Sequence, residues 1–179
     1  MRQLLVRILI FVTAVILLFS AIGSFLPRDF TVSTEIEINA PAEVVFQQVN
    51  ELKNWQNWSS WNPRTIPELD IEFGSETAGK GASQTWTDLR GDGKLWITES
   101  QPHKKLEYKL EFGGFPEMTS QFKLVDSNGK TKVSWNSEGR MPPGPFYGFF
   151  GFLFESGLQH EYEKNLTDLK RVAEQEAKK

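Results

Sequence analysis

Cysteine is absent from the 179 residues, and histidine occurs only twice. A chain without cysteine forms no disulfide and offers no thiol nucleophile, iron–sulfur cluster or cysteine-ligated zinc site. His103 falls in a predicted turn, and His160 stands beside Glu161 on a predicted helix, where adjacent positions do not face one ligand. The sequence also lacks a GxSxG elbow, an HExxH motif and a complete phosphate-binding glycine loop. We therefore predict no metal site and no cofactor.

Acidic residues outnumber basic ones beyond the first 28 positions. The chain has 20 Lys and Arg against 23 Asp and Glu, for a net charge of −3. Arg2, Arg7 and Arg28 are the only charged residues among the first 28, so residues 29–179 carry 17 basic and 23 acidic side chains. Nucleic-acid binders need a basic surface to neutralise phosphates. The acidic remainder therefore argues against a nucleic-acid partner.

Residues 8–26 form an uncharged, mostly apolar run. As a helix this run would be about 28 Å long, close to the roughly 30 Å hydrocarbon core of a bilayer. Because Arg2 and Arg7 precede it, we expect a cytoplasmic N-terminus and a body outside the cytoplasm, which is the periplasm if the source is bacterial. We divide the chain into an anchor, residues 1–28, and a domain, residues 29–179.

A cleaved signal peptide is the alternative reading of the same run. Ser20, Ala21, Gly23 and Ser24 are small residues at which a signal peptidase could cut. The apolar run continues beyond them, which favours an uncleaved transmembrane helix. Both readings send the domain to the same side of the membrane.

Alternating apolar and polar residues predict an antiparallel sheet with one solvated face. The predicted strands are 30–38, 69–73, 81–89, 94–101, 105–113, 117–125 and 130–140. Short helices are predicted at 41–50 and 52–58, and an amphipathic helix runs from residue 155 towards the C-terminus. A one-sided sheet and an amphipathic helix must bury their apolar faces, which favours a curved sheet wrapped around the last helix.

Several segments, in this order, resemble the START-like superfamily, which includes polyketide cyclases, pollen allergens and lipid-transfer domains. They are IEINAPAEVVF (36–46), NWQNWSSW (54–61), GKLWITE (93–99), FESGL (154–158) and NLTDLK (165–170). The resemblance covers about residues 30–175. It implies an α+β helix-grip fold, with a curved antiparallel sheet around a long C-terminal helix and two short helices after the first strand. It also implies a cavity between sheet and helix. Members bind lipids, sterols, polyketides or other apolar molecules, and only some are enzymes. The N-terminal membrane helix departs from the commonest soluble members.

Candidate ligand-binding residues lie on the predicted concave face and in an aromatic segment before the last helix. They are Gln84, Trp86, Ile97, Glu99, Tyr108, Phe122, Trp135 and Phe149. Apolar walls with a few polar groups are typical of a small-molecule pocket. A packed core that contains some hydroxyl groups would produce the same pattern.

Glu99 and Tyr108 are the candidate catalytic residues. Alternation from Leu95 and Ile97 predicts that Glu99 faces inward, where an apolar cavity would raise its pKa and suit it to acid–base chemistry. A change of phase near Pro102 would instead leave Glu99 exposed.

Two aromatic clusters have more than one reading. Trp55, Trp58 and Trp61 recur every three residues and fit core packing or a binding platform. The segment 142–154 contains six aromatic residues in a short span, and it fits a cavity gate, a membrane contact or packing under the long helix.

We expect a membrane-anchored domain that binds an apolar or amphipathic small molecule, such as a lipid, without catalysis. A cyclase- or dehydratase-like enzyme is one alternative, and a structural or protein-interaction module with a filled core is another. Nothing in the sequence predicts an oligomeric state.

Overall fold

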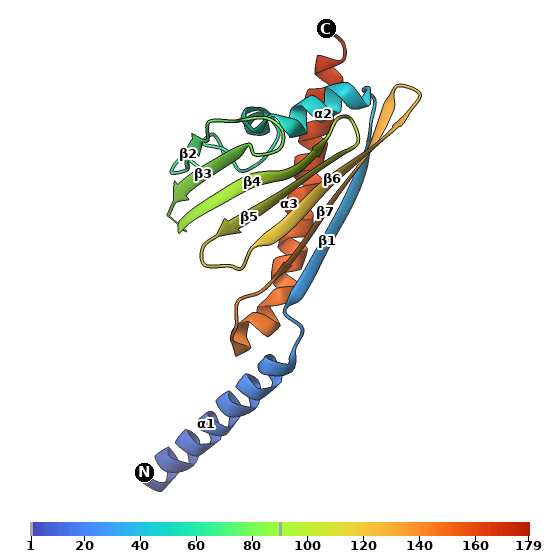
Figure 1. The fold of residues 1–179 in the computed structure, drawn as a ribbon. Helices are drawn as coiled ribbons and strands as arrows, with labels where there is room; N and C mark the ends of the chain where they lie inside the picture. The colour runs from blue at the N-terminus through green and yellow to red at the C-terminus, as the bar shows by residue number, and fades with distance from the viewer. Residues whose placement is uncertain (1, 90) are drawn as a thin grey trace.

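The computed structural model describes residues 2–89 and 91–179, and its central feature is a seven-stranded antiparallel sheet (Figure 1). The strands are β1 (Asp29–Ile38), β2 (Asp70–Phe73), β3 (Ser83–Asp88), β4 (Gly91–Gln101), β5 (Lys105–Phe112), β6 (Met118–Ser127) and β7 (Lys130–Arg140). Their order across the sheet is β1-β7-β6-β5-β4-β3-β2. Strands β2 to β7 therefore form a meander, and β1 closes the sheet beside β7.

The helices follow the predicted order. They are α1 (Arg2–Phe25), α2 (Ala42–Asn50), the 3₁₀ helix η1 (Leu52–Asn57) and α3 (Pro145–Glu176). Helix α3 runs along the concave face of the curved sheet (Figure 1). Leu166, Leu169 and Ala173 of α3 are buried, as their helical spacing predicts. This arrangement confirms the α+β helix-grip fold.

Helix α3 begins ten residues earlier than the predicted residue 155. Gly144 precedes it with a φ of 140°, and Pro145 occupies the first turn, where its missing N–H is not needed. Gly148 and Gly151 each weaken a helix by about 1 kcal/mol, which is why the sequence pattern does not predict one here. Contacts with α1 and with Phe115 offset this cost. Most of the aromatic segment is therefore the first part of α3.

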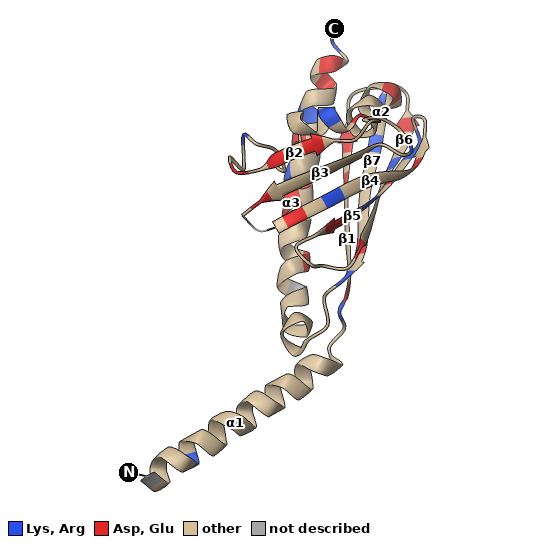
Figure 2. Cartoon of the chain, turned by 60° about the vertical axis from the view of Figure 1, so that its left-hand side comes forward, with Lys and Arg blue, Asp and Glu red and all other residues tan. Residues whose placement is uncertain are grey.

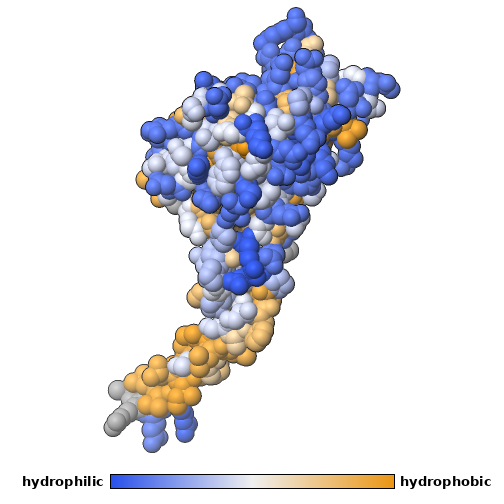
Figure 3. Space-filling model, viewed as in Figure 1, coloured by the Kyte–Doolittle hydropathy of each residue, from blue (hydrophilic) through white to orange (hydrophobic). Residues whose placement is uncertain are grey.

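Helix α1 projects away from the domain and meets it near the start of α3 (Figure 1). Its segment Gln3–Phe25 is long and apolar enough to cross a membrane. Figure 2 shows α1 and the adjoining part of α3 almost free of charged residues, and Figure 3 shows the apolar surface of α1 below a largely hydrophilic domain.

Two glycines allow α1 and α3 to cross closely. A Cβ atom on Gly23 would collide with the carbonyl oxygen of Pro145, and one on Gly148 would collide with the carbonyl oxygen of Gly23. Beside this crossing, the rings of Phe19 and Phe149 stack with their centroids 4.0 Å apart. The crossing therefore depends on backbone-to-backbone approach that larger residues would prevent.

Candidate ligand cavity

A cavity of about 170 Å³ lies between the concave face of the sheet and α3. Its walls come from η1 and the loop after it, from strands β2 to β7, and from the middle of α3. The lining residues are Leu52, Trp55, Gln56, Ser59, Ser60, Trp61, Ile71, Gln84, Trp86, Leu95, Tyr108, Leu110, Phe112, Met118, Trp135, Phe154, Leu158, Glu161, Tyr162 and Asn165. Most of this surface is apolar, and much of it is aromatic.

The aromatic walls hold one another in place. The rings of Trp135 and Tyr162 stack with centroids 3.7 Å apart. Trp55 meets Tyr108 edge-to-face at 5.1 Å, and similar contacts join other rings around the cavity. Aromatic pairs of this kind contribute roughly 0.5–1.5 kcal/mol beyond burial. The cavity therefore has stiff walls that would not collapse readily when it is empty.

The three tryptophans spaced three residues apart do not all have the same role: two line the cavity and one packs in the core. Trp55 and Trp61 line the cavity, whereas Trp58 is buried and does not. The indole nitrogen Nε1 of Trp55 donates to the carbonyl oxygen of Val49 at 2.8 Å, and that of Trp58 donates to the carbonyl oxygen of Gln48 at 3.1 Å. These bonds connect η1 and the residue after it to α2, and they hold this wall of the cavity in place.

Hydroxyl groups form a buried polar cluster in one wall of the cavity. Trp135 Nε1 donates to the Tyr108 hydroxyl at 3.1 Å. The Ser137 hydroxyl lies 2.6 Å from the Tyr162 hydroxyl and 2.5 Å from Ser120 Oγ. Alternation along β5, β6 and β7 brings Tyr108, Ser120, Trp135 and Ser137 to the concave face, and α3 supplies Tyr162.

Burial determines the ionisation of the two tyrosines. Desolvation raises the pKa of Tyr108 well above its usual value, and the neighbouring Tyr162 raises it further. Desolvation likewise raises the pKa of Tyr162, although hydrogen bonds from Ser137 and Ser120 oppose the shift. Both side chains are therefore neutral at physiological pH. They can exchange hydrogen bonds with a ligand, but they are poor general bases.

The structure brings together half of the residues predicted for ligand binding. Gln84, Trp86, Tyr108 and Trp135 line the cavity. Ile97 and Phe122 are buried in the core and do not line it.

Glu99 does not face the cavity, contrary to the strand alternation. The register of β4 against β5 shifts between Ile97 and Glu99, which changes the face that the following residues present. The carboxylate pairs with Lys105 Nζ at 2.5 Å, and the Gln101 amide also donates to it. The hydrogen bond from Lys105 is the main cause of a lowered Glu99 pKa. The expectation of a raised pKa in an apolar site was therefore wrong, and Glu99 and Tyr108 do not share a site.

Phe149 also lies outside the cavity. Its ring stacks on Phe19 of α1, because residues 145–154 are helical and this face of α3 meets α1. Phe154, one turn and a residue further along α3, lines the cavity in its place.

The predicted ligand-binding residues include none from the middle of α3 or from the loop after η1, although both line the cavity. Leu158 and Tyr162 stand four residues apart on the predicted apolar stripe, so a helix packed on the concave face would have suggested them. Asn165 Oδ1 accepts from the Ser60 amide at 2.8 Å and joins the loop to α3. Glu161 supplies a carboxylate to the lining. Within residues 2–89 and 91–179, no group of three or more His, Asp or Glu side chains is arranged to hold a metal ion.

A second hollow, of about 470 Å³, runs along the outside of α3 beside the cavity. Its lining residues are Ser60, Trp61, Thr65, Ile66, Leu153, Phe154, Gly157, Leu158, Glu161 and Lys164. We call it the α3 groove. Ser60, Trp61, Phe154, Leu158 and Glu161 line both the groove and the cavity. These five residues are therefore the partition between them.

Comparison with known proteins gives the same fold. The family described as polyketide cyclase / dehydrase and lipid transport matches residues 29–174. Protein MLL2253 from Mesorhizobium loti is 14% identical, with a TM-score of 0.61 over 82% of this chain and 98% of that one. TTHA0849 from Thermus thermophilus is 16% identical, with a TM-score of 0.61 over 80% and 97%. The Aha1 dimer from Colwellia psychrerythraea is 17% identical, with a TM-score of 0.58 over 81% and 96%. No curated protein matches the chain.

Proposed function

Since the chain belongs to the polyketide cyclase / dehydrase and lipid transport family, we propose that it binds an apolar or amphipathic small molecule, such as a lipid. The ligand occupies the cavity between the sheet and α3, and binding is not coupled to catalysis. Residues 1–28 anchor residues 29–179 to a membrane, with the domain outside the cytoplasm. The charge distribution supports this orientation, because Arg2 and Arg7 precede the apolar run and no acidic residue does.

The observation that carries the proposal is the cavity itself, an apolar space of about 170 Å³ with aromatic walls. An apolar cavity on the order of 150 Å³ stays dry and takes up a benzene-sized molecule. The space found here therefore suits one ring or a short alkyl segment. A longer chain would have to continue past Phe154 and Leu158 into the α3 groove. A packed core without space, the third alternative from the sequence, does not account for such a cavity.

The polar groups in the cavity wall fit the binding of an amphipathic ligand better than they fit catalysis. The hydroxyls of Tyr108 and Tyr162 are neutral and already hydrogen-bonded within the cluster. Gln84, a buried residue at 6% exposure, adds an amide donor and acceptor to the lining. The enzyme alternative relied on Glu99 and Tyr108, and Glu99 lies outside the cavity. Binding thus needs fewer additional assumptions than catalysis.

Tryptophan fluorescence offers a direct test. Four of the six tryptophans line the cavity, and α1 contains none. Full-length protein in lipid nanodiscs would be titrated with 9,10-dibromostearic acid, whose bromines quench tryptophan on contact. We expect saturable quenching of most of the emission. Absence of quenching in the folded protein would contradict the proposal.

Two double variants provide a matched comparison. Leu95 and Leu110 are cross-strand partners whose side chains line the cavity, whereas Lys94 and Glu111 are the next cross-strand pair on the opposite face. The double variant Leu95→Phe, Leu110→Phe reduces the cavity and should lose most of the quenching. The double variant Lys94→Phe, Glu111→Phe should retain it. Equal quenching in both would show that the fatty acid reaches tryptophan elsewhere.

A further inference from the structure

The first turns of α3 present an apolar stripe to solvent. Phe146, Phe150 and Leu153 are 72%, 48% and 63% exposed, respectively. Their spacing of four and three residues places them on one side of the helix. No charged residue occurs between Arg140 and Glu155. Large exposed apolar side chains grouped in this way usually mark a surface that is covered by something else.

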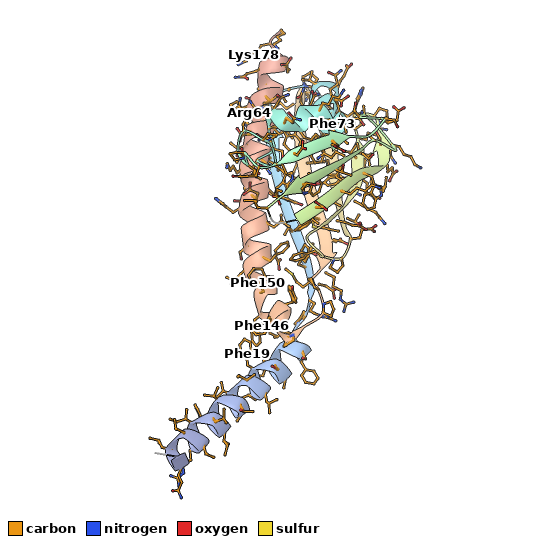
Figure 4. All side chains as sticks on the ribbon, turned by 90° about the vertical axis from the view of Figure 1, so that its left-hand side faces the viewer. Phe19, Arg64, Phe73, Phe146, Phe150 and Lys178 are labelled. Atoms are coloured by element: carbon orange, nitrogen blue, oxygen red, sulfur yellow. The ribbon has the colours of Figure 1, made fainter. Side chains whose placement is uncertain are left out.

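The same turns of α3 are held against α1. Gly23 and Gly148 permit the close crossing, and Phe19 lies 6.0 Å from Phe146 between ring centroids. Figure 4 shows Phe146 and Phe150 at the end of α3 that adjoins α1, next to Phe19. The apolar stripe is therefore continuous with the surface of the candidate membrane span.

Charged groups mark the boundary of this apolar surface. Arg28 follows soon after α1, and its carbonyl oxygen accepts from the Met141 amide at 2.8 Å, which brings the end of β7 beside it. Arg140 pairs with Asp29 at 3.3 Å on the same side of the domain. Arginines at this position suit the lipid headgroup level, with apolar residues on the hydrocarbon side.

We propose that Phe146, Phe150 and Leu153 form a second membrane-contact surface that inserts into the same bilayer as α1. The occupant of this surface is lipid, because the stripe is uncharged, continuous with α1 and bounded by arginines. Leu153 also lines the α3 groove. The groove therefore opens at the bilayer surface, and a lipid chain can pass along it to the partition at Leu158 and into the cavity. This inference rests on the membrane placement of α1 in the proposed function.

Because the chain contains no cysteine, an introduced cysteine can be labelled at a single position. Single-cysteine variants of the full chain, Phe150→Cys and Leu153→Cys, would be labelled with bimane and reconstituted in phosphatidylcholine vesicles brominated near the top of the acyl chains. Val125→Cys is the matched control, because Val125 is also an exposed apolar residue, at 61%, but lies near the end of β6 remote from α1. Leu17→Cys reports insertion of α1 itself.

We expect the labels at 150, 153 and 17 to lose at least half of their fluorescence relative to unbrominated vesicles, and the label at 125 to lose almost none. Labels at 150 and 153 that behave like the one at 125, with the label at 17 quenched, would overturn this inference and leave the proposed function standing. An unquenched label at 17 would overturn both the inference and the membrane placement. Tryptophan quenching by dibromostearic acid remains a separate measure of cavity binding.

Discussion

The two ends of α3 differ in composition as well as in surroundings, because Pro145–Leu153 contains no charged residue and Tyr162–Ala173 contains five. From Tyr162 to Ala173 the helix is gripped by the sheet, and Leu166 and Leu169 are at most 1% exposed. From Pro145 to Leu153 it meets α1, and its outward side chains are exposed. One continuous helix therefore joins the globular core to the candidate membrane span.

Polar contacts distinguish the two ends as well. In the C-terminal half, Tyr162 bonds to Ser137, and Lys170 Nζ donates to the carbonyl oxygen of Glu37 at 2.8 Å. In the N-terminal half, the packing consists of stacked aromatic rings and the glycine crossing. Directional bonds specify one register against the sheet, whereas apolar stacking alone does not. We therefore expect mutations in the two halves to differ in the type of interaction that they remove and in the size of the stability change.

The largest effect is expected in the gripped half. Leu166→Ala should lower the free energy of unfolding of the domain by about 2–5 kcal/mol, because a fully buried leucine leaves a cavity behind. Urea unfolding of the full chain in mild detergent measures this change. Lys164→Ala, an exposed position two residues earlier, should change stability by less than about 0.5 kcal/mol. Similar small losses for both variants would show that the sheet does not grip α3.

A smaller effect is expected at the hydroxyl cluster. Tyr162→Phe should cost about 1 kcal/mol at neutral pH, because it removes the hydrogen bond to Ser137 but keeps the ring stacked on Trp135. Tyr147→Phe, the same change near the start of α3, is the control and should cost less.

The pH dependence sharpens this test. Burial raises the pKa of Tyr162 and Tyr108 above the ordinary value of 10.0, so the folded protein keeps protons that the unfolded chain releases. Their contribution to stability is complete below about pH 10 and is lost as the pH rises through the folded-state pKa values. Melting temperatures measured from pH 8 to 11 should fall above pH 10, and less steeply for Tyr162→Phe. A steeper fall in the variant would contradict the assignment.

The smallest effect is expected in the half that meets α1. Phe149→Ser should change the unfolding free energy of the domain by less than about 1 kcal/mol, because Phe149 stacks on Phe19 and not on the sheet. Phe154→Ser is the matched comparison, since Phe154 packs against Phe30 and Phe115 with centroids 5.1 and 5.5 Å apart. It should cost at least about 1 kcal/mol more. A reversed order would place the boundary between the two halves of α3 elsewhere.

Periodicity in the sequence was sufficient to predict the strands, their antiparallel order and the buried stripe of α3. Period-two alternation and turn residues depend on local chemistry, and so does the apolar run of α1. The pattern was also sufficient to place Gln84, Trp86, Tyr108 and Trp135 on the concave face. It failed for Glu99, because a one-residue irregularity in β4 reverses the face without changing the composition of the strand.

Spacing along the chain encodes an apolar N-terminal run, a one-sided sheet and an amphipathic helix, in this order. Which aromatic residues surround a cavity and which meet α1 depends instead on tertiary packing. Phe149 and Phe154 are chemically identical and lie five positions apart, yet one stacks on Phe19 and the other lines the cavity. That outcome depends on the length of α3, the close approach at Gly23 and Gly148, and the curvature of the sheet, which arise only when distant segments pack together.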